Sequence, residues 1–215
     1  MKALIKKEFK LALHPTVPLF WLLSAMLIIP NYPYYVAFFY TTLGLFFVCL
    51  TGRENRDIQY SMMLPVAKRD IVRGRFIFTL IVECVQVIAA IPFAVLRARL
   101  VPAPNAAGMD ANVALFGLSL IMLGLFNIVF FTRYYSAPDK VGGAFIRGSI
   151  AVFVYVALAE TAAHVVPFVR DRLDTPDPQF MTEKLCVLAI GIIAYAALTW
   201  AGYRISVRRF EHLDI

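Results

Sequence analysis

Long apolar segments alternate along the chain with short polar segments, and the charged residues gather in the polar ones. Six of the apolar segments approach the ~20 residues that a helix needs to cross the hydrocarbon core of a bilayer. They are residues 17–30, 35–50, 76–96, 113–132, 149–166 and 185–203. Because unpaired backbone groups are costly in lipid, each segment is expected to be helical. The pattern predicts an all-α, polytopic membrane protein with six transmembrane helices.

The first apolar segment, residues 17–30, is the shortest of the six. Its 14 residues reach only ~21 Å at ~1.5 Å per residue, against a hydrocarbon core of ~30 Å. We expect this helix either to tilt into the membrane from Leu11 or to sit in a locally thinned bilayer. Residues 31–33 then form a tight turn, with tyrosines at the membrane surface.

The amino-terminal residues 1–14 combine an apolar stripe with lysines. Leu4, Ile5, Phe9 and Leu13 recur at helical spacing, and four lysines lie around them. This pattern predicts an interfacial helix that lies along the cytoplasmic headgroups. A basic start before an apolar run also resembles a signal peptide, but the run ends in IIPNYPYY instead of a small-residue cleavage site. We therefore expect the segment to be retained.

Residues 53–75 form the most charged internal segment, with the sequence RENRDIQYSMMLPVAKRDIVRGR. Within it, residues 54–64 are expected to form a short helix with Ile58 and Met62 on its apolar face. Pro65 is expected to end that helix, because proline disfavours helical structure in the residue before it.

A second helix is expected to begin near Lys68 and to run into the third apolar segment. Ala67 occupies its cap position without a side-chain acceptor. A connecting loop held only by lipid phosphates would explain the arginines, but it would not need an amphipathic helix, a methionine pair and a proline stop. A Met-rich face flanked by both signs of charge is typical of an adaptable docking surface.

The composition excludes a soluble domain. Hydrophobic residues make up 60% of the chain and charged residues 16%, against about half and about a quarter in soluble domains. A soluble core of 215 residues could not bury that much apolar surface. Cys49, Cys84 and Cys186 all lie in apolar segments, so we interpret them as packing residues instead of disulfide partners.

The 21 lysines and arginines outnumber the 14 acidic residues, a balance that in a soluble protein would suggest nucleic acid as a partner. Here the positive residues flank apolar segments, where they act as topology signals. With six spans, sixteen of them lie on the side that holds both termini and residues 53–75, and five lie on the other side. This bias predicts that both termini and residues 53–75 are cytoplasmic.

Polar residues also lie inside the predicted spans. Glu83, Gln86 and Asn127 are candidate residues of a translocation path, the alternative being structural hydrogen bonds between helices. Glu160 and His164, four residues apart, are either exposed at the interface or the acid/base pair of a membrane-embedded hydrolase. No HExxH, GxSxG or intramembrane Asp pair supports such an enzyme, and no metal site is expected.

Residues 53–75 resemble the coupling segment of type-2 ABC exporter permeases. The resemblance lies in the Leu-Pro-Val of residues 64–66 and the Lys-Arg-Asp-Ile-Val of residues 68–72. The Lys-Lys-Glu-Phe-Lys of residues 6–10 resembles that family's opening, and the six-span layout and short basic tail are similar too. The resemblance covers essentially the whole chain. One departure is Ala67, where many relatives are expected to carry Ser or Thr.

The resemblance implies a single transmembrane permease domain, residues 1–215, that pairs with a second permease, identical or different, and with two separate ATP-binding subunits. ATP and Mg would bind to those subunits. No cofactor is expected in this chain, whose nearest approach to a phosphate-binding loop, residues 143–149, lacks the required lysine. The chain is therefore expected to be no enzyme, and its other partners are membrane lipids. Docking contacts are expected at Asp57, Ile58, Tyr60, Met62, Met63, Leu64 and Pro65.

We expect a permease of the inner (plasma) membrane that exports a hydrophobic or amphipathic molecule, such as a peptide, an antibiotic or a lipid-like compound. The short outer loops leave little room for a substrate-capturing domain. Two other classes remain as alternatives. One is a membrane-embedded hydrolase that uses Glu160 and His164, and the other is a structural or regulatory membrane protein.

Overall fold

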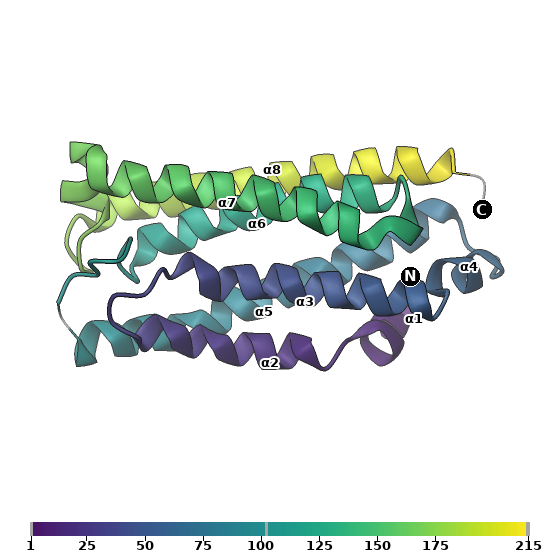
Figure 1. Ribbon diagram of the computed structural model, residues 1–215, viewed down its shortest axis with the longest axis horizontal. Helices are drawn as coiled ribbons and strands as arrows, with labels where there is room; N and C mark the ends of the chain where they lie inside the picture. The colour runs from purple at the N-terminus through teal and green to yellow at the C-terminus, as the bar shows by residue number, and fades with distance from the viewer. Residues whose placement is uncertain (1, 102, 214–215) are drawn as a thin grey trace.

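The structure is built from helices, as the sequence predicts. The computed structural model describes residues 2–101 and 103–213, and no strand occurs among them. The helices lie side by side in one elongated bundle (Figure 1). In chain order they are α1 (Lys2–Lys7), η1 (Glu8–Ala12), α2 (Thr16–Leu22), η2 (Leu23–Ile28), α3 (Tyr35–Glu54), α4 (Asp57–Met62), α5 (Lys68–Leu100), α6 (Val113–Tyr134), η3 (Pro138–Lys140), α7 (Val141–Val165), η4 (Val169–Leu173) and α8 (Met181–Glu211).

Five helices are long and apolar enough to cross a membrane, namely α3, α5, α6, α7 together with η3, and α8. The first predicted span is a shorter apolar helix, formed by α2 and η2, that packs against α3 and α5 (Figure 1). It stops at Ile28 because Ile29 precedes Pro30 and adopts an extended backbone. A multi-pass membrane protein is confirmed, whereas the sixth span is not.

Several helices extend into regions that the sequence pattern assigns to loops. Arg97 lies inside α5, and Arg147 lies inside α7. These loop assignments are wrong because apolar content marks only the part of a helix that faces lipid. The helix itself continues until a breaking or capping residue ends it.

Two helix starts agree with the sequence. The helix α5 begins at Lys68, and Ala67 at its cap provides no side-chain hydrogen bond. The helix α6 begins at Val113, where the side chain of Asn112 accepts a hydrogen bond from the Leu115 amide at 3.0 Å. This amide would otherwise lack a partner, so Asn112 acts as an N-cap.

Glycines allow α6 and α8 to pack backbone against backbone. A Cβ atom placed on Gly117 of α6 would lie 2.7 Å from the Val187 carbonyl oxygen, and one on Gly202 of α8 would lie 3.0 Å from the Ile128 Cα atom. Small residues at such crossings are typical of helix pairs in membranes, because van der Waals packing holds them together. The α6–α8 pair therefore forms the tightest contact of the bundle.

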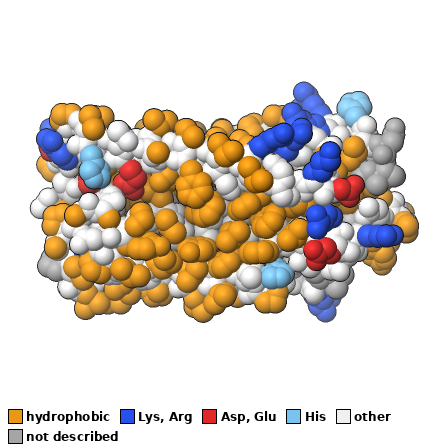
Figure 2. Space-filling model, viewed as in Figure 1, with side chains coloured by type: hydrophobic (Ala, Val, Ile, Leu, Met, Phe, Trp, Pro, Cys, Tyr) orange, Lys and Arg blue, Asp and Glu red, His pale blue; other side chains and the backbone are white. Residues whose placement is uncertain are grey.

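The two ends of the bundle differ in charge. Figure 1 places α1, α4 and the last turns of α8 at one end, and the segments that join α5 to α6 and α7 to α8 at the other. On the face drawn in Figure 2, apolar side chains cover the middle, and most of the visible lysines and arginines lie at the α4 end. This distribution is typical of a protein whose middle faces hydrocarbon.

Candidate functional site

The charged segment between the second and third predicted spans folds as the short helix α4. The sequence predicts a helix from residue 54, but α3 continues to Glu54, and Arg56 then takes a left-handed conformation with a φ of 51°. The turn moves the start of α4 to Asp57. The helix ends at Met62, ahead of Pro65 as predicted, but two residues before the predicted end at Leu64.

Four charged side chains meet beneath α4, and we call them the ionic cluster: Lys7, Glu8, Asp57 and Arg75. The carboxylate of Asp57 lies 2.7 Å from Lys7 Nζ and 2.9 Å from Arg75 Nη2. The carboxylate of Glu8 lies 3.1 Å from Arg75 Nε and 3.3 Å from Lys7 Nζ. The ionic cluster therefore joins three elements, namely the amino-terminal helix, α4 and α5.

The ionic cluster is enclosed by the protein. The side chains of Glu8 and Arg75 are only 3% and 4% exposed, and that of Asp57 is 16% exposed. Charges buried this far must be paired, because the loss of one partner leaves an uncompensated charge. Lys7 also donates a hydrogen bond to the buried Ser61 hydroxyl of α4 at 2.9 Å. The amino-terminal helix and α4 are thus held to α5 by charge as well as by packing.

The helix predicted at the amino terminus is present as α1 and η1, and part of it faces the protein. Leu4 and Glu8 are buried, whereas Lys6 and Lys10 are exposed. The membrane-surface position of this segment stays a prediction. The sequence holds one sign of the ionic cluster in this segment. Glu8 is its single acidic residue and stands among lysines, which an interfacial helix with a purely basic polar face would not require.

The seven residues expected to dock a partner divide into an outer and an inner set. Tyr60, Met63, Leu64 and Pro65 are exposed, and Met63 is the most exposed of them at 82%. We call these four residues the α4 surface. The inner set packs or pairs within the chain: Ile58 is buried, Met62 is half-buried, and Asp57 belongs to the ionic cluster.

The structure brings two of the three candidate path residues together. Glu83 of α5 accepts hydrogen bonds from the Asn127 amide of α6 at 2.9 Å and from the Tyr195 hydroxyl of α8. Asn127 also donates to the Thr199 hydroxyl at 3.2 Å. Gln86 lies elsewhere and donates to the Ser24 hydroxyl at 2.9 Å. In this conformation these side chains are buried and connect helices.

We expect Asn127→Leu to lower the melting temperature of the purified protein. The change removes a donor to the buried Glu83 carboxylate, and an unsatisfied buried group costs about 1–3 kcal/mol. Thermal unfolding in detergent measures the effect. Ser149→Ala is the control, because the buried Ser149 hydroxyl has no partner among the described residues. Equal melting temperatures for the two variants would show that the Asn127 contact contributes nothing.

Glu160 and His164 do not form an acid/base pair through their side chains. His164 Nδ1 lies 2.9 Å from the backbone oxygen of Glu160, while the Glu160 carboxylate accepts a hydrogen bond from the Met109 amide at 3.0 Å. Glu160 therefore holds the loop between α5 and α6 against α7. Among the described residues there is no group of three or more His, Cys, Asp or Glu that could hold a metal ion.

The comparison with protein-family models identifies the chain. Residues 3–211 match the model described as ABC-2 family transporter protein. No curated protein and no solved structure is similar enough to count as a match. The match covers nearly the whole chain, and the bundle has the apolar helices that such a membrane protein needs. The chain therefore belongs to the ABC-2 transporter family, and it is a multi-pass membrane permease of the kind that associates with an ATP-binding subunit.

Proposed function

We propose that this chain is the permease subunit of an ATP-driven exporter and that α4 is its coupling helix. The observation that carries the proposal is the combination of an exposed α4 surface with a buried ionic cluster directly beneath it. A coupling element needs both features, because it must contact a partner on one side and be fixed to the spans on the other.

The force that ATP binding generates in the partner enters through the α4 surface. Asp57 passes it to Arg75, which lies near the start of the 33-residue helix α5. Lys7 passes it to the amino-terminal helix. A movement of α4 therefore moves α5 and α1 with it as one rigid body. This motion switches the access of the substrate path from one side of the membrane to the other.

A second permease, identical or different, completes the transporter with two ATP-binding subunits. ATP and Mg belong to those subunits, and this chain binds no cofactor. The α4 end is cytoplasmic and the membrane is the inner (plasma) membrane, as the excess of lysine and arginine at this end supports. The exported molecule is hydrophobic or amphipathic, which agrees with the short segments at the opposite end.

A small hollow beside α4 supports docking at this end. Its volume is about 280 Å³, and it lies between the end of α3, α4 and the turn that follows α6. Gly52, Gln59, Pro138 and Asp139 are among its lining residues. A side chain of the ATP-binding subunit has room to enter this hollow, which two α4 residues, Ile58 and Gln59, help to line.

We expect Met63→Asp to reduce co-purification of the ATP-binding subunit by about thirtyfold, since an apolar anchor in an interface contributes about 2 kcal/mol. The permease itself should fold normally, because Met63 is 82% exposed. The assay measures the amount of ATP-binding subunit retained on the tagged permease. Met63→Leu is the matched control and should retain it. Full retention by Met63→Asp would contradict docking at the α4 surface.

A further inference from the structure

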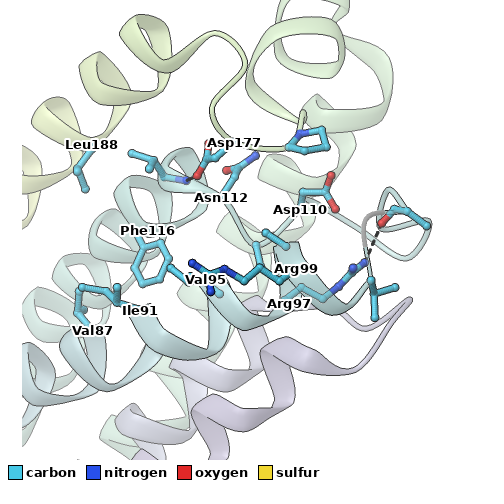
Figure 3. Close-up of a pocket in the computed structure, with 17 residues that line it drawn as sticks. Val87, Ile91, Val95, Arg97, Arg99, Asp110, Asn112, Phe116, Asp177 and Leu188 are labelled. Atoms are coloured by element: carbon cyan, nitrogen blue, oxygen red, sulfur yellow. Dashed lines mark hydrogen bonds between the residues drawn. The ribbon is translucent and has the colours of Figure 1, made fainter.

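A large pocket lies at the end of the bundle opposite α4. It has a volume of about 740 Å³ and is bounded by the last turns of α5, the start of α6 and the first part of α8 (Figure 3). This volume lies in the range of about 300–1,000 Å³ that is usual for small-molecule sites. None of the candidate path residues Glu83, Gln86 and Asn127 lines it.

One part of the pocket is apolar. Val87, Ile91, Val95, Phe116 and Leu188 line it, and they come from α5, α6 and α8. Ile91 is 49% exposed and Val95 is 50% exposed, so the pocket is open along α5. An apolar chain that enters from the hydrocarbon core of the membrane can therefore pack against these apolar side chains, which form the floor of the pocket.

The other part of the pocket carries charged groups, and most of them already have partners. Arg97 donates to the Tyr34 hydroxyl at 2.8 Å and to the Ala103 carbonyl oxygen at 2.9 Å. Asp177 pairs with the buried Lys184 at 2.9 Å and accepts from the Val113 amide at 3.1 Å. These groups are used to hold the loops in place.

Asp110 is also engaged. Its carboxylate accepts a hydrogen bond from the Asn105 amide at 2.8 Å. Burial raises the pKa of Asp110 above its ordinary value, and this hydrogen bond opposes the rise. The group has therefore lost part of its hydration, and one of its carboxylate oxygens is engaged by the loop that joins α5 to α6.

Arg99 is the charged lining residue that has no partner among the described residues. It makes no ion pair or hydrogen bond there, and its side chain points from α5 toward Phe116 (Figure 3). A guanidinium group binds phosphate or carboxylate oxygens in a bidentate manner. The pocket therefore places one available cation beside an apolar chamber.

We propose that this pocket binds an anionic amphiphile, with one acyl chain on the apolar floor and the anionic head at Arg99. A zwitterionic head also offers a phosphate, but its ammonium group brings a second positive charge close to the guanidinium and weakens the pairing, and a cationic head offers no counter-charge. The volume suits one chain better than a whole two-chain lipid, so a two-chain lipid would insert a single chain. Both a bilayer lipid and a free single-chain amphiphile share this chemistry. The proposal concerns binding alone and does not depend on the export function.

Native mass spectrometry of the full-length permease tests the proposal without ATP or a partner subunit. The protein is released from a neutral detergent with equal concentrations of lysophosphatidylglycerol and lysophosphatidylcholine. We expect the anionic adduct to exceed the zwitterionic one about tenfold, because both heads offer a phosphate to Arg99 and only the zwitterionic head also brings a cation near it. Arg99→Gln should abolish the preference, whereas Arg147→Gln, an exposed arginine of α7, should keep it.

A second pair of variants tests the apolar part. Val95→Trp fills the pocket and should reduce both adducts, whereas Val154→Trp on the exposed face of α7 should reduce neither. Two-chain phosphatidylglycerol distinguishes the sources. Binding of this lipid assigns the site to a bilayer lipid, and binding of the one-chain form alone assigns it to a free amphiphile. Equal adducts of both head groups, or an unchanged preference in Arg99→Gln, would overturn the proposal.

Discussion

Gly191→Val is expected to abolish the folded permease. A Cβ atom on Gly191 of α8 would lie 2.7 Å from both the Cα and the carbonyl carbon of Gly117 in α6. Backbone atoms cannot move aside as a flexible side chain can, so the two helices must separate. Overpacking a core costs about 1–3 kcal/mol where side chains can adjust. At this crossing the clashing atoms belong to the backbone and cannot adjust, so we expect a larger loss of folding free energy. The monodisperse protein peak should then disappear from size-exclusion chromatography.

The chain offers a matched control for this change. A Cβ atom placed on Gly142 or Gly143, at the start of α7, would have no atom within 4 Å outside its own helix among the described residues. Gly142→Val should therefore leave the yield and the melting temperature close to those of the wild type. Equal yields for Gly191→Val and Gly142→Val would show that the α6–α8 contact is not as close as described.

Arg75→Met is expected to produce the second-largest effect, a loss of about 3–5 kcal/mol in the free energy of unfolding. The change leaves Glu8 without its 3.1 Å partner and Asp57 with Lys7 alone, both inside the protein. Thermal unfolding in detergent measures the stability, and ATPase activity of the reconstituted complex measures coupling. We expect both to fall, since α4 loses its attachment to α5.

A double variant separates charge from packing. Arg75→Met combined with Glu8→Gln removes the guanidinium and one of the carboxylates it compensates, so it should recover part of the stability lost in Arg75→Met. Coupling should stay low in the double variant, because Asp57 still has no bond to α5. Recovery of both properties together would show that the ionic cluster serves stability alone.

The approximate positions of five of the six spans and two helix starts were predictable from the sequence. Apolar run length indicates where a helix faces lipid, and Ala67 and Asn112 lie where the next helix begins. The helix ends were less predictable, because charged residues such as Arg147 continue a helix as readily as they end it. The family was predictable too, since its resemblance extends over the whole chain.

The interior of the candidate site was not predictable from the sequence. Lys7 and Asp57 are 50 residues apart in the chain, and no periodicity relates charges over that distance. The pattern also placed Ile58 and Met62 on a docking face, whereas the fold buries Ile58 and exposes Met63. The left-handed conformation of Arg56, which rotates α4 relative to α3, has no clear signal in the sequence.

Site-specific photo-crosslinking at Met63 tests the coupling role of α4 most directly. A benzophenone amino acid replaces Met63 in intact cells, and the crosslinked product is identified by mass spectrometry. Position 150, an exposed isoleucine on α7, serves as the control. A product that contains an ATP-binding cassette subunit at position 63, and not at position 150, is the predicted result. The absence of that subunit at position 63 in cells that assemble an active transporter would contradict the role of α4.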